Sequence, residues 1–124
     1  MAYLNDLVLD NGLSYVNANG SRLDICSQEP ANYTEATSTY TLGNKTSLTA
    51  GAPENGDSSG RKSVIPAITD GSVTGTGTAS HWGYSKTSAT AALLAATSLS
   101  SSQAVTSGNT FTLGAIDITI PDPS

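Results

Sequence analysis

The residues with the clearest catalytic pattern are a serine, an aspartate and the single histidine of the chain. Ser58 lies in the pentapeptide GDSSG (56–60), which fits the motif G-x-S-x-G, and Asp70 and His81 follow in the order of an α/β-hydrolase triad. That chemistry needs the serine on a sharp strand-to-helix turn, where the histidine accepts its proton. No helical pattern follows the pentapeptide, and chance matches are expected in a chain rich in Ser and Gly. We therefore interpret the chain as non-enzymatic, with no catalytic residues.

Patterns for metal binding and redox chemistry are weak. Asp117 and Asp122 are candidates for a calcium site with loop carbonyls, but they lack the dense D-x-D spacing of such sites. The single cysteine, Cys26, excludes an internal disulfide, and no CxxC or Cys/His pair offers zinc ligands. We predict no metal site and no cofactor, and we expect Cys26 to be a small buried or half-buried side chain.

The aromatic residues offer a different kind of chemistry. Trp82 and Tyr84 are alternate residues of an expected strand and share one face of it, and His81 lies on the other face. Because tryptophan buries a large area, we expect Trp82 to anchor the core, with His81 an exposed or hydrogen-bonded sheet residue. The alternative is that Trp82, Tyr84 or Tyr33 forms an exposed stacking platform, which would make the chain a carbohydrate- or receptor-binding β-module.

Length and charge exclude several classes of function. The 124 residues suit a single domain (1–124) with one modest core. The net charge is −5 and only five Lys or Arg occur, so we predict no direct nucleic-acid binding. No segment approaches the roughly 20 apolar residues of a membrane span, and no basic region precedes an apolar run at the N-terminus. We therefore predict neither a membrane span nor a signal peptide.

Residues 3–18 form the helical pattern that precedes the β region. Apolar residues recur at three- to five-residue steps from Leu4 to Val16. Asn5 or Asp6 is the expected N-cap, and Asn19-Gly20 is expected to close the helix as a C-cap. Because so short a helix needs a surface to lie on, we expect it to cover one open end or face of a sheet. The alternative is that it docks on a neighbouring subunit.

Residues 21–122 read as a β-module in which turn signals separate short apolar runs. We expect strands over 21–27, 61–68, 72–79, 78–85, 89–98, 103–106, 110–113 and 116–120. We also expect two strands around a Gly43-Asn44 turn within 40–48, a turn at Asp70-Gly71, and a loop over 50–60. Strands 103–106 and 110–113 are expected to form a hairpin. The pattern indicates a mainly β fold, an antiparallel β-sandwich or jelly-roll-like barrel with one short N-terminal helix.

Strand parity predicts which side chains form the core. In strand 21–27, Leu23 and Ile25 are expected to point inward, with Asp24 and Cys26 outward. Gly114-Ala115 shifts the phase of the last two strands, as a β-bulge or bend does. The expected core comprises Leu23, Ile25, Val64, Ile68, Trp82, Leu94, Leu99, Val105, Phe111, Leu113, Ile116 and Ile118.

Four stretches of the chain form a recognisable series. They are Arg22–Pro30 behind a short helix, HWGY (81–84), LLA (93–95), and SQAVTSGNTFTL (102–113) before an alternating Ile strand. Together they resemble small virion structural proteins of tailed bacteriophages. The resemblance covers about residues 3–30 and 61–122.

This resemblance implies a virion protein assembled in the host cytoplasm, most simply a capsid decoration (cement) protein on the outside of the head shell. The implied partners are the major capsid protein, copies of the chain itself, or both. The alternative within the virion is a head–tail or tail-associated subunit. The helix at 3–18 and the loop at 50–60 are the expected contacts with neighbouring subunits.

Overall fold

The computed structural model describes residues 6–57, 60–87 and 90–120, and within α1 it describes side chains from residue 11 onward. Over these residues the chain forms an N-terminal helix, a short π-helical segment and nine strands. The elements are α1 (Asp6–Asn19), β1 (Gly20–Cys26), η1 (Glu35–Thr39), β2 (Thr41–Lys45), β3 (Glu54–Asn55), β4 (Arg61–Ile65), β5 (Ile68–Val73), β6 (Gly77–Lys86), β7 (Ala92–Val105), β8 (Thr110–Leu113) and β9 (Ile116–Ile120). The predicted mainly β fold with one short N-terminal helix is confirmed.

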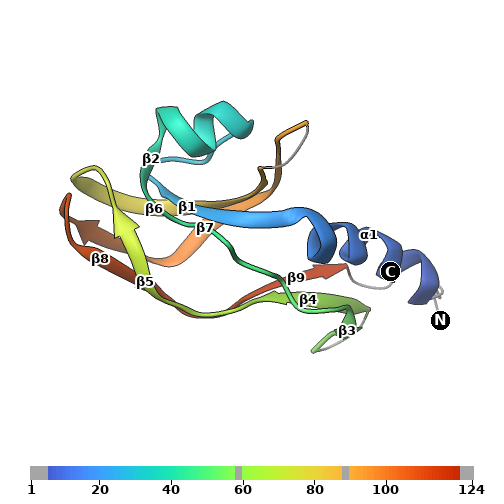
Figure 1. Ribbon diagram of the computed structural model, residues 1–124. Helices are drawn as coiled ribbons and strands as arrows, with labels where there is room; N and C mark the ends of the chain where they lie inside the picture. The colour runs from blue at the N-terminus through green and yellow to red at the C-terminus, as the bar shows by residue number, and fades with distance from the viewer. Residues whose placement is uncertain (1–5, 58–59, 88–89, 121–124) are drawn as a thin grey trace.

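The strands form two antiparallel sheets that share a ribbon. One sheet has the order β7-β6-β1-β2-β5-β8 and the other has the order β3-β4-β9. Strand β4 leads into β5, and β8 leads into β9, so these four strands form one long two-stranded ribbon. Figure 1 shows the larger sheet curling from an upper layer of β6 and β1 to a lower layer of β5 and β8, from which the ribbon continues toward β4 and β9.

The ribbon is interrupted at the same level on both strands. Pro66-Ala67 separates β4 from β5, and Gly114-Ala115 separates β8 from β9, while Ile65 pairs with Ile116 and Ile68 with Leu113 on either side. Proline has no N–H for a ladder hydrogen bond, which explains the break in the first strand. The predicted bend at Gly114-Ala115 is confirmed, and it carries the ribbon from one sheet to the other.

The core lies between the layers and against α1. Leu23, Ile25, Ile68, Trp82 and Phe111 are buried as predicted. Further buried members of the core cluster are Leu48, Ala50, Ile65, Val73, Ala79 and Tyr84, and the predicted residues Leu99, Val105, Leu113, Ile116 and Ile118 are partly buried against it.

Two members of the predicted core were wrong. Strand β4 turns Ser63 and Ile65 inward, so Val64 is only half-buried. The inward hydroxyl of Ser63 is satisfied because it donates to the carbonyl oxygen of Gly51 at 2.7 Å. Leu94 is also half-buried and lies outside the core cluster, at a point where the register between β6 and β7 shifts.

Two dipeptides that predicted turns lie inside strands. Gly43-Asn44 belongs to β2, which is one strand, and Asp70-Gly71 belongs to β5. A Cβ at Gly71 would lie 2.3 Å from the ring of Phe111, whereas a Cβ at Gly43 would lie 2.5 Å from the carbonyl oxygen of Ser72 on β5. These glycines therefore serve close packing, and the turn predictions are wrong.

The predicted 103–113 hairpin is also wrong in its pairing. The chain does turn after β7, where the Asn109 N–H donates to the Thr106 carbonyl at 3.1 Å. However, β7 pairs with β6 and β8 pairs with β5, at opposite edges of the six-stranded sheet. The expected strand over 72–79 is likewise divided, because β5 ends at Val73 and β6 begins at Gly77.

Helix α1 covers the smaller sheet, as predicted. Leu13 is buried, Val16 packs against the core, and the helix contacts β4 and β9. The helix ends at Asn19 as expected, but Gly20 is explained by space and not by a left-handed cap. A Cβ at Gly20 would lie 2.1 Å from the ring of Tyr84.

Candidate functional site

The two edges of the six-stranded sheet, β7 and β8, approach each other along a seam. The Gln103 side chain donates across it from Nε2 to the Thr112 carbonyl at 3.3 Å. On the β7 side, the register with β6 jumps from Ser98 to Gln103, so that residues 99–102 bulge out of the ladder. On the other side lies the break at Gly114-Ala115. Both walls of the seam are therefore interrupted, and such bulges are common beside binding sites.

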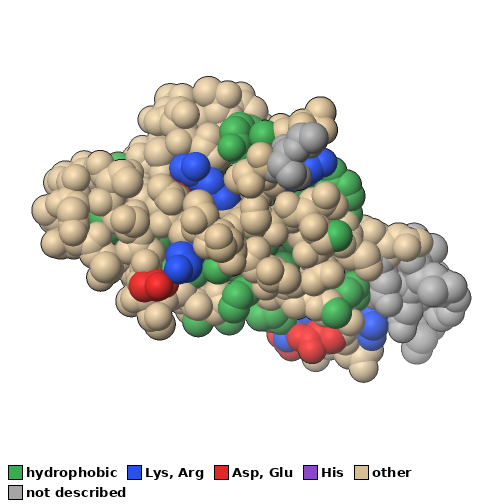
Figure 2. Space-filling view, viewed as in Figure 1, with side chains coloured by type: hydrophobic (Ala, Val, Ile, Leu, Met, Phe, Trp, Pro, Cys, Tyr) green, Lys and Arg blue, Asp and Glu red, His purple; other side chains and the backbone are tan. Residues whose placement is uncertain are grey.

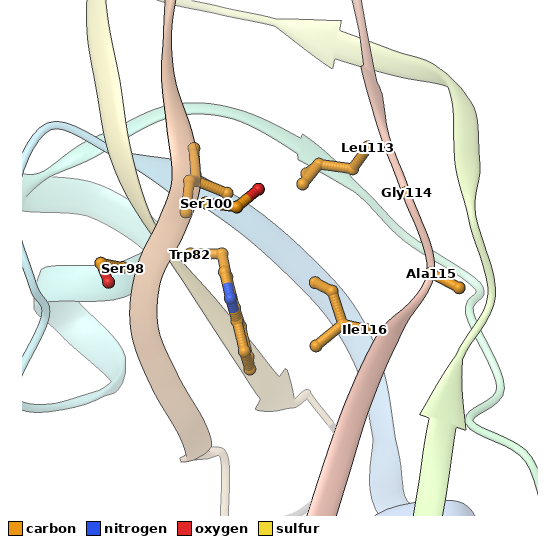
Figure 3. A pocket seen from close by; sticks show the side chains of 8 residues that line it. Trp82, Ser98, Ser100, Leu113, Gly114, Ala115 and Ile116 are labelled. Carbon is orange, nitrogen blue, oxygen red and sulfur yellow. The ribbon is translucent and has the colours of Figure 1, made fainter. Parts of the chain in front are cut away.

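A pocket of about 260 Å³ opens in this seam. Figure 3 shows Leu113 and Ile116 on the β8–β9 side of the pocket. Their side chains point across the pocket toward Trp82 and toward β7, which carries Ser100. The lining residues are Trp82, Ser98, Leu99, Ser100, Leu113, Gly114, Ala115 and Ile116. The lining contains no charged side chain, so the pocket suits an uncharged apolar group.

The sequence patterns did not indicate this pocket. Trp82, Leu99, Leu113 and Ile116 were expected in the core, and Ser98 and Ser100 carried no functional signal. One signal was available in the sequence. No charged residue and no proline occur from Thr87 to Ile116, the stretch that builds both walls of the seam.

The aromatic residues considered for sugar stacking are largely buried. Tyr84 has no exposed surface and Trp82 is 6% exposed, which confirms that Trp82 anchors the core. Tyr33 is half-buried next to η1. The small exposed part of Trp82 is of interest because this residue lines the pocket.

A partly buried ion pair lies on the opposite face of β1. Asp24 and Cys26 were predicted to point outward, and they do leave the main core, but η1 covers them. The Arg22 guanidinium donates to Asp24 Oδ1 at 2.7 Å and to Oδ2 at 2.9 Å, and this hydrogen bonding raises the pKa of Arg22. The Thr41 hydroxyl donates to Asp24 Oδ2 at 2.7 Å. These groups satisfy one another, so the arrangement is structural.

The segment η1 that covers this pair has a capping signal that the sequence reasoning missed. The Glu35 N–H donates to Asn32 Oδ1 at 2.9 Å, and the Ala31 N–H donates to Glu35 Oε1 at 2.8 Å. This is close to the capping-box pattern, in which the N-cap side chain and the acid three residues later each accept a backbone N–H.

The residues of the hydrolase motif are not assembled in the part of the chain that the structure describes. Asp70 lies on β5 and His81 on β6, with β1 and β2 between them, so they do not form the acid–histidine pair of a triad. Asp70 instead pairs with Lys45 at 3.1 Å, and His81 Nδ1 lies 2.8 Å from the Ser80 hydroxyl. Ser58 lies outside the described residues.

Of the two candidate calcium ligands, Asp117 pairs with a lysine and Asp122 is not described. Asp117 accepts a hydrogen bond from Lys62 at 3.2 Å, and Asp57 accepts one from the same ammonium at 2.7 Å. Lys62 therefore holds the pKa of Asp57 below its usual value, and the two carboxylates raise the pKa of Lys62. Asp122 lies outside the described residues, and over the residues that are described no cluster of three His, Cys, Asp or Glu side chains has the arrangement of a metal site.

Cys26 is buried, as predicted, and burial raises the pKa of its thiol to about 12. An unfolded chain can ionise this thiol above about pH 8.5, whereas the folded chain keeps it protonated to much higher pH. The folded state therefore binds more protons in this range, and stability falls as the pH rises through it.

We expect the free energy of unfolding to decrease between pH 9 and 11 more steeply in the native sequence than in Cys26→Ala. Urea unfolding at pH 7, 9, 10 and 11 measures this difference. Tyr84, whose pKa is also raised by burial, is common to both proteins and cancels in the comparison. Equal slopes in the two proteins would contradict the assignment to Cys26.

Comparison with protein-family models, with curated proteins and with solved structures gives no match. Within the described part of the chain, no helix has the length and apolar character needed to cross a membrane.

Proposed function

We propose that this chain is a non-enzymatic structural protein of a tailed-phage virion, and that it binds the outside of the head shell as a decoration protein. The observation that carries the proposal is the charge-free stretch from Thr87 to Ile116 in a chain of net charge −5. The centres of protein–protein interfaces are depleted of charged residues, because desolvating an unpaired charge is costly. This stretch therefore suits burial against another subunit.

The shape of the molecule supports a bridging role. In Figure 1, α1 and β3 lie at one end, and β8 with the β5–β6 turn lies at the other. Figure 2 shows that in this view the end over β8 carries neither acidic nor basic side chains, apart from one acid–base pair at its lower edge. Helix α1 and the segment 50–57, which contains the short strand β3 where the sequence predicted only a loop, offer a second contact. Two separated contacts allow one copy to join two neighbouring shell subunits and to oppose their separation.

The implied partners are the major capsid protein and further copies of this chain. The resemblance of residues 3–30 and 61–122 to small virion proteins supports the virion as the location. A place at the head–tail connector or in the tail uses the same kind of surface, so the number of copies separates the two.

We expect the chain to be present in purified virions at a copy number close to that of the major capsid protein. Quantitative mass spectrometry with isotope-labelled peptides of both proteins measures the ratio. The matched control is a known tail protein of the same particle. A ratio typical of tail components would replace decoration by a connector or tail role, and absence from the particle would reject a virion role altogether.

A further inference from the structure

We propose that the seam pocket is a docking socket for an extended, uncharged segment of a different protein, which inserts one large apolar side chain beside Trp82. The inference rests on the proposed function, because the segment would belong to a shell subunit.

The size and chemistry of the pocket define the inserted group. At about 260 Å³ it is smaller than the roughly 300–1,000 Å³ of pockets that enclose whole small molecules. An engineered apolar cavity of about 150 Å³ accepts benzene, so a space of this size accommodates one aromatic ring or branched aliphatic side chain. Trp82, Leu113 and Ile116 provide apolar contact, and no charged residue of the lining selects for an ion.

The interrupted walls favour a peptide over a free apolar molecule. Residues 99–102 have no partner in the β6–β7 register, and Gly114-Ala115 lies between β8 and β9. Backbone groups that leave a ladder at a sheet edge are a template for an added strand. Among the described residues, the indole N–H of Trp82 donates to no protein acceptor, and it is not one of the fully buried polar atoms. The carbonyl of an inserted peptide can therefore accept a hydrogen bond from it.

The described strands of a second copy of this chain do not match that occupant. Over the described residues with assigned exposure, Tyr15 at 48% is the large hydrophobic side chain that is exposed. It lies on α1, not on a strand, and Lys86 Nζ sits 5.6 Å from the centre of its ring. No described strand offers an exposed large apolar side chain, so we assign the inserted segment to a different protein.

The single tryptophan of the chain makes the pocket directly observable. We would record the indole N–H signal of the ¹⁵N-labelled full chain during titration with acetyl-Ala-Phe-Ala-amide, acetyl-Ala-Leu-Ala-amide and acetyl-Ala-Glu-Ala-amide. We expect the Phe and Leu peptides to shift the signal with millimolar half-saturation, as suits ligands of this size, and the Glu peptide to leave it unchanged.

Two matched variants place the binding in the pocket. Ser100→Phe adds a ring at a lining position, and Ser101→Phe adds the same ring at an adjacent exposed position outside the lining. We expect Ser100→Phe to weaken peptide binding by about tenfold or more, and Ser101→Phe to bind as the native chain does. If Ser100→Phe does not fold, Gly114→Leu replaces it, because a Cβ at Gly114 meets no atom within 4 Å. No shift with any peptide, an equal shift with the Glu peptide, or full binding by the blocked variant would overturn the proposal.

A second arm separates this inference from the proposed function. The native chain and both Ser variants are added to particles lacking the chain, and bound copies are counted by mass spectrometry. We expect the native chain and Ser101→Phe to bind and Ser100→Phe to be lost. Equal binding of all three would overturn the socket while leaving a virion role intact. Peptide binding without any binding to particles would reject the shell subunit as partner, and with it the proposal as stated.

Discussion

Replacing Asp24 by alanine is expected to lower the free energy of unfolding by about 3 kcal/mol, because it removes a buried carboxylate from an ion pair and from three hydrogen bonds. Asp24 has no exposed surface, and its carboxylate accepts two hydrogen bonds from Arg22 and one from Thr41. Without the carboxylate, the Arg22 guanidinium keeps, among the described residues, a long contact of 3.5 Å to the Thr37 carbonyl, on the segment that packs over β1. Both the charge and the Thr41 hydroxyl lose a partner.

The measurement is urea unfolding followed by circular dichroism, with a fixed slope across variants. Asp70→Ala is the matched control, because Asp70 also pairs with a cation, Lys45, but its side chain is 67% exposed. Exposed pairs contribute about 0–1 kcal/mol, so the control is expected to change little. Similar effects of the two substitutions would show that the Arg22–Asp24 pair does not stabilise the fold as described.

Replacing Phe111 by alanine is expected to cost about 3–5 kcal/mol, the usual range for removing a buried aromatic side chain. Phe111 is 3% exposed and lies on β8 opposite Gly71 of the neighbouring strand β5. Its ring fills the space left by the missing side chain of Gly71 on β5 and lies 3.3 Å from the position of a Cβ at Gly43 on β2, so the ring reaches across three strands. Truncation would leave a cavity that the backbone of a paired sheet cannot close.

The contact between the ring and Gly71 gives this prediction a second test. Gly71→Ala alone places a Cβ 2.3 Å from the ring and is expected to destabilise by overpacking, about 1–3 kcal/mol. In the Phe111→Ala background that clash is absent, so the two changes together should cost less than their sum. Thr112→Ala, at an exposed neighbouring position, is the control and is expected to have little effect. If the effects of the two substitutions on the free energy of unfolding added exactly, the contact between Phe111 and Gly71 would be contradicted.

Elements whose signal lies in neighbouring residues were predicted well. The helix expected over 3–18 is α1 (Asp6–Asn19), and the strands expected over 21–27 and 78–85 are β1 and β6 with limits shifted by about one residue. Amphipathic spacing, alternation and turn residues act between positions close in the chain, so the sequence shows them directly. The bend at Gly114-Ala115 was predictable for the same reason. The apolar residues occupy odd positions before this dipeptide and even positions after it, and that change is visible in the sequence.

Glycine positions show where local interpretation fails. Gly43-Asn44 and Asp70-Gly71 have the composition of turns, yet both lie within strands. The ring of Phe111 takes the side-chain space at Gly71, and the backbone of Ser72 takes it at Gly43. The same limit applies to Asp24 and Cys26. Alternation alone placed them on an outer face, and only the docking of η1 against that face buries them.

The sequence by itself determined the class of fold, the position of most strands and the charge-free stretch from Thr87 to Ile116. Only the tertiary structure decided that β8 pairs with β5 and not with β7, and that the two edges of the sheet then meet around Trp82. The physical reason is that strand pairing is chosen by hydrogen bonds and packing between distant segments. A turn after β7 is compatible with either pairing, and the curl of the whole sheet selects the one that opens the pocket.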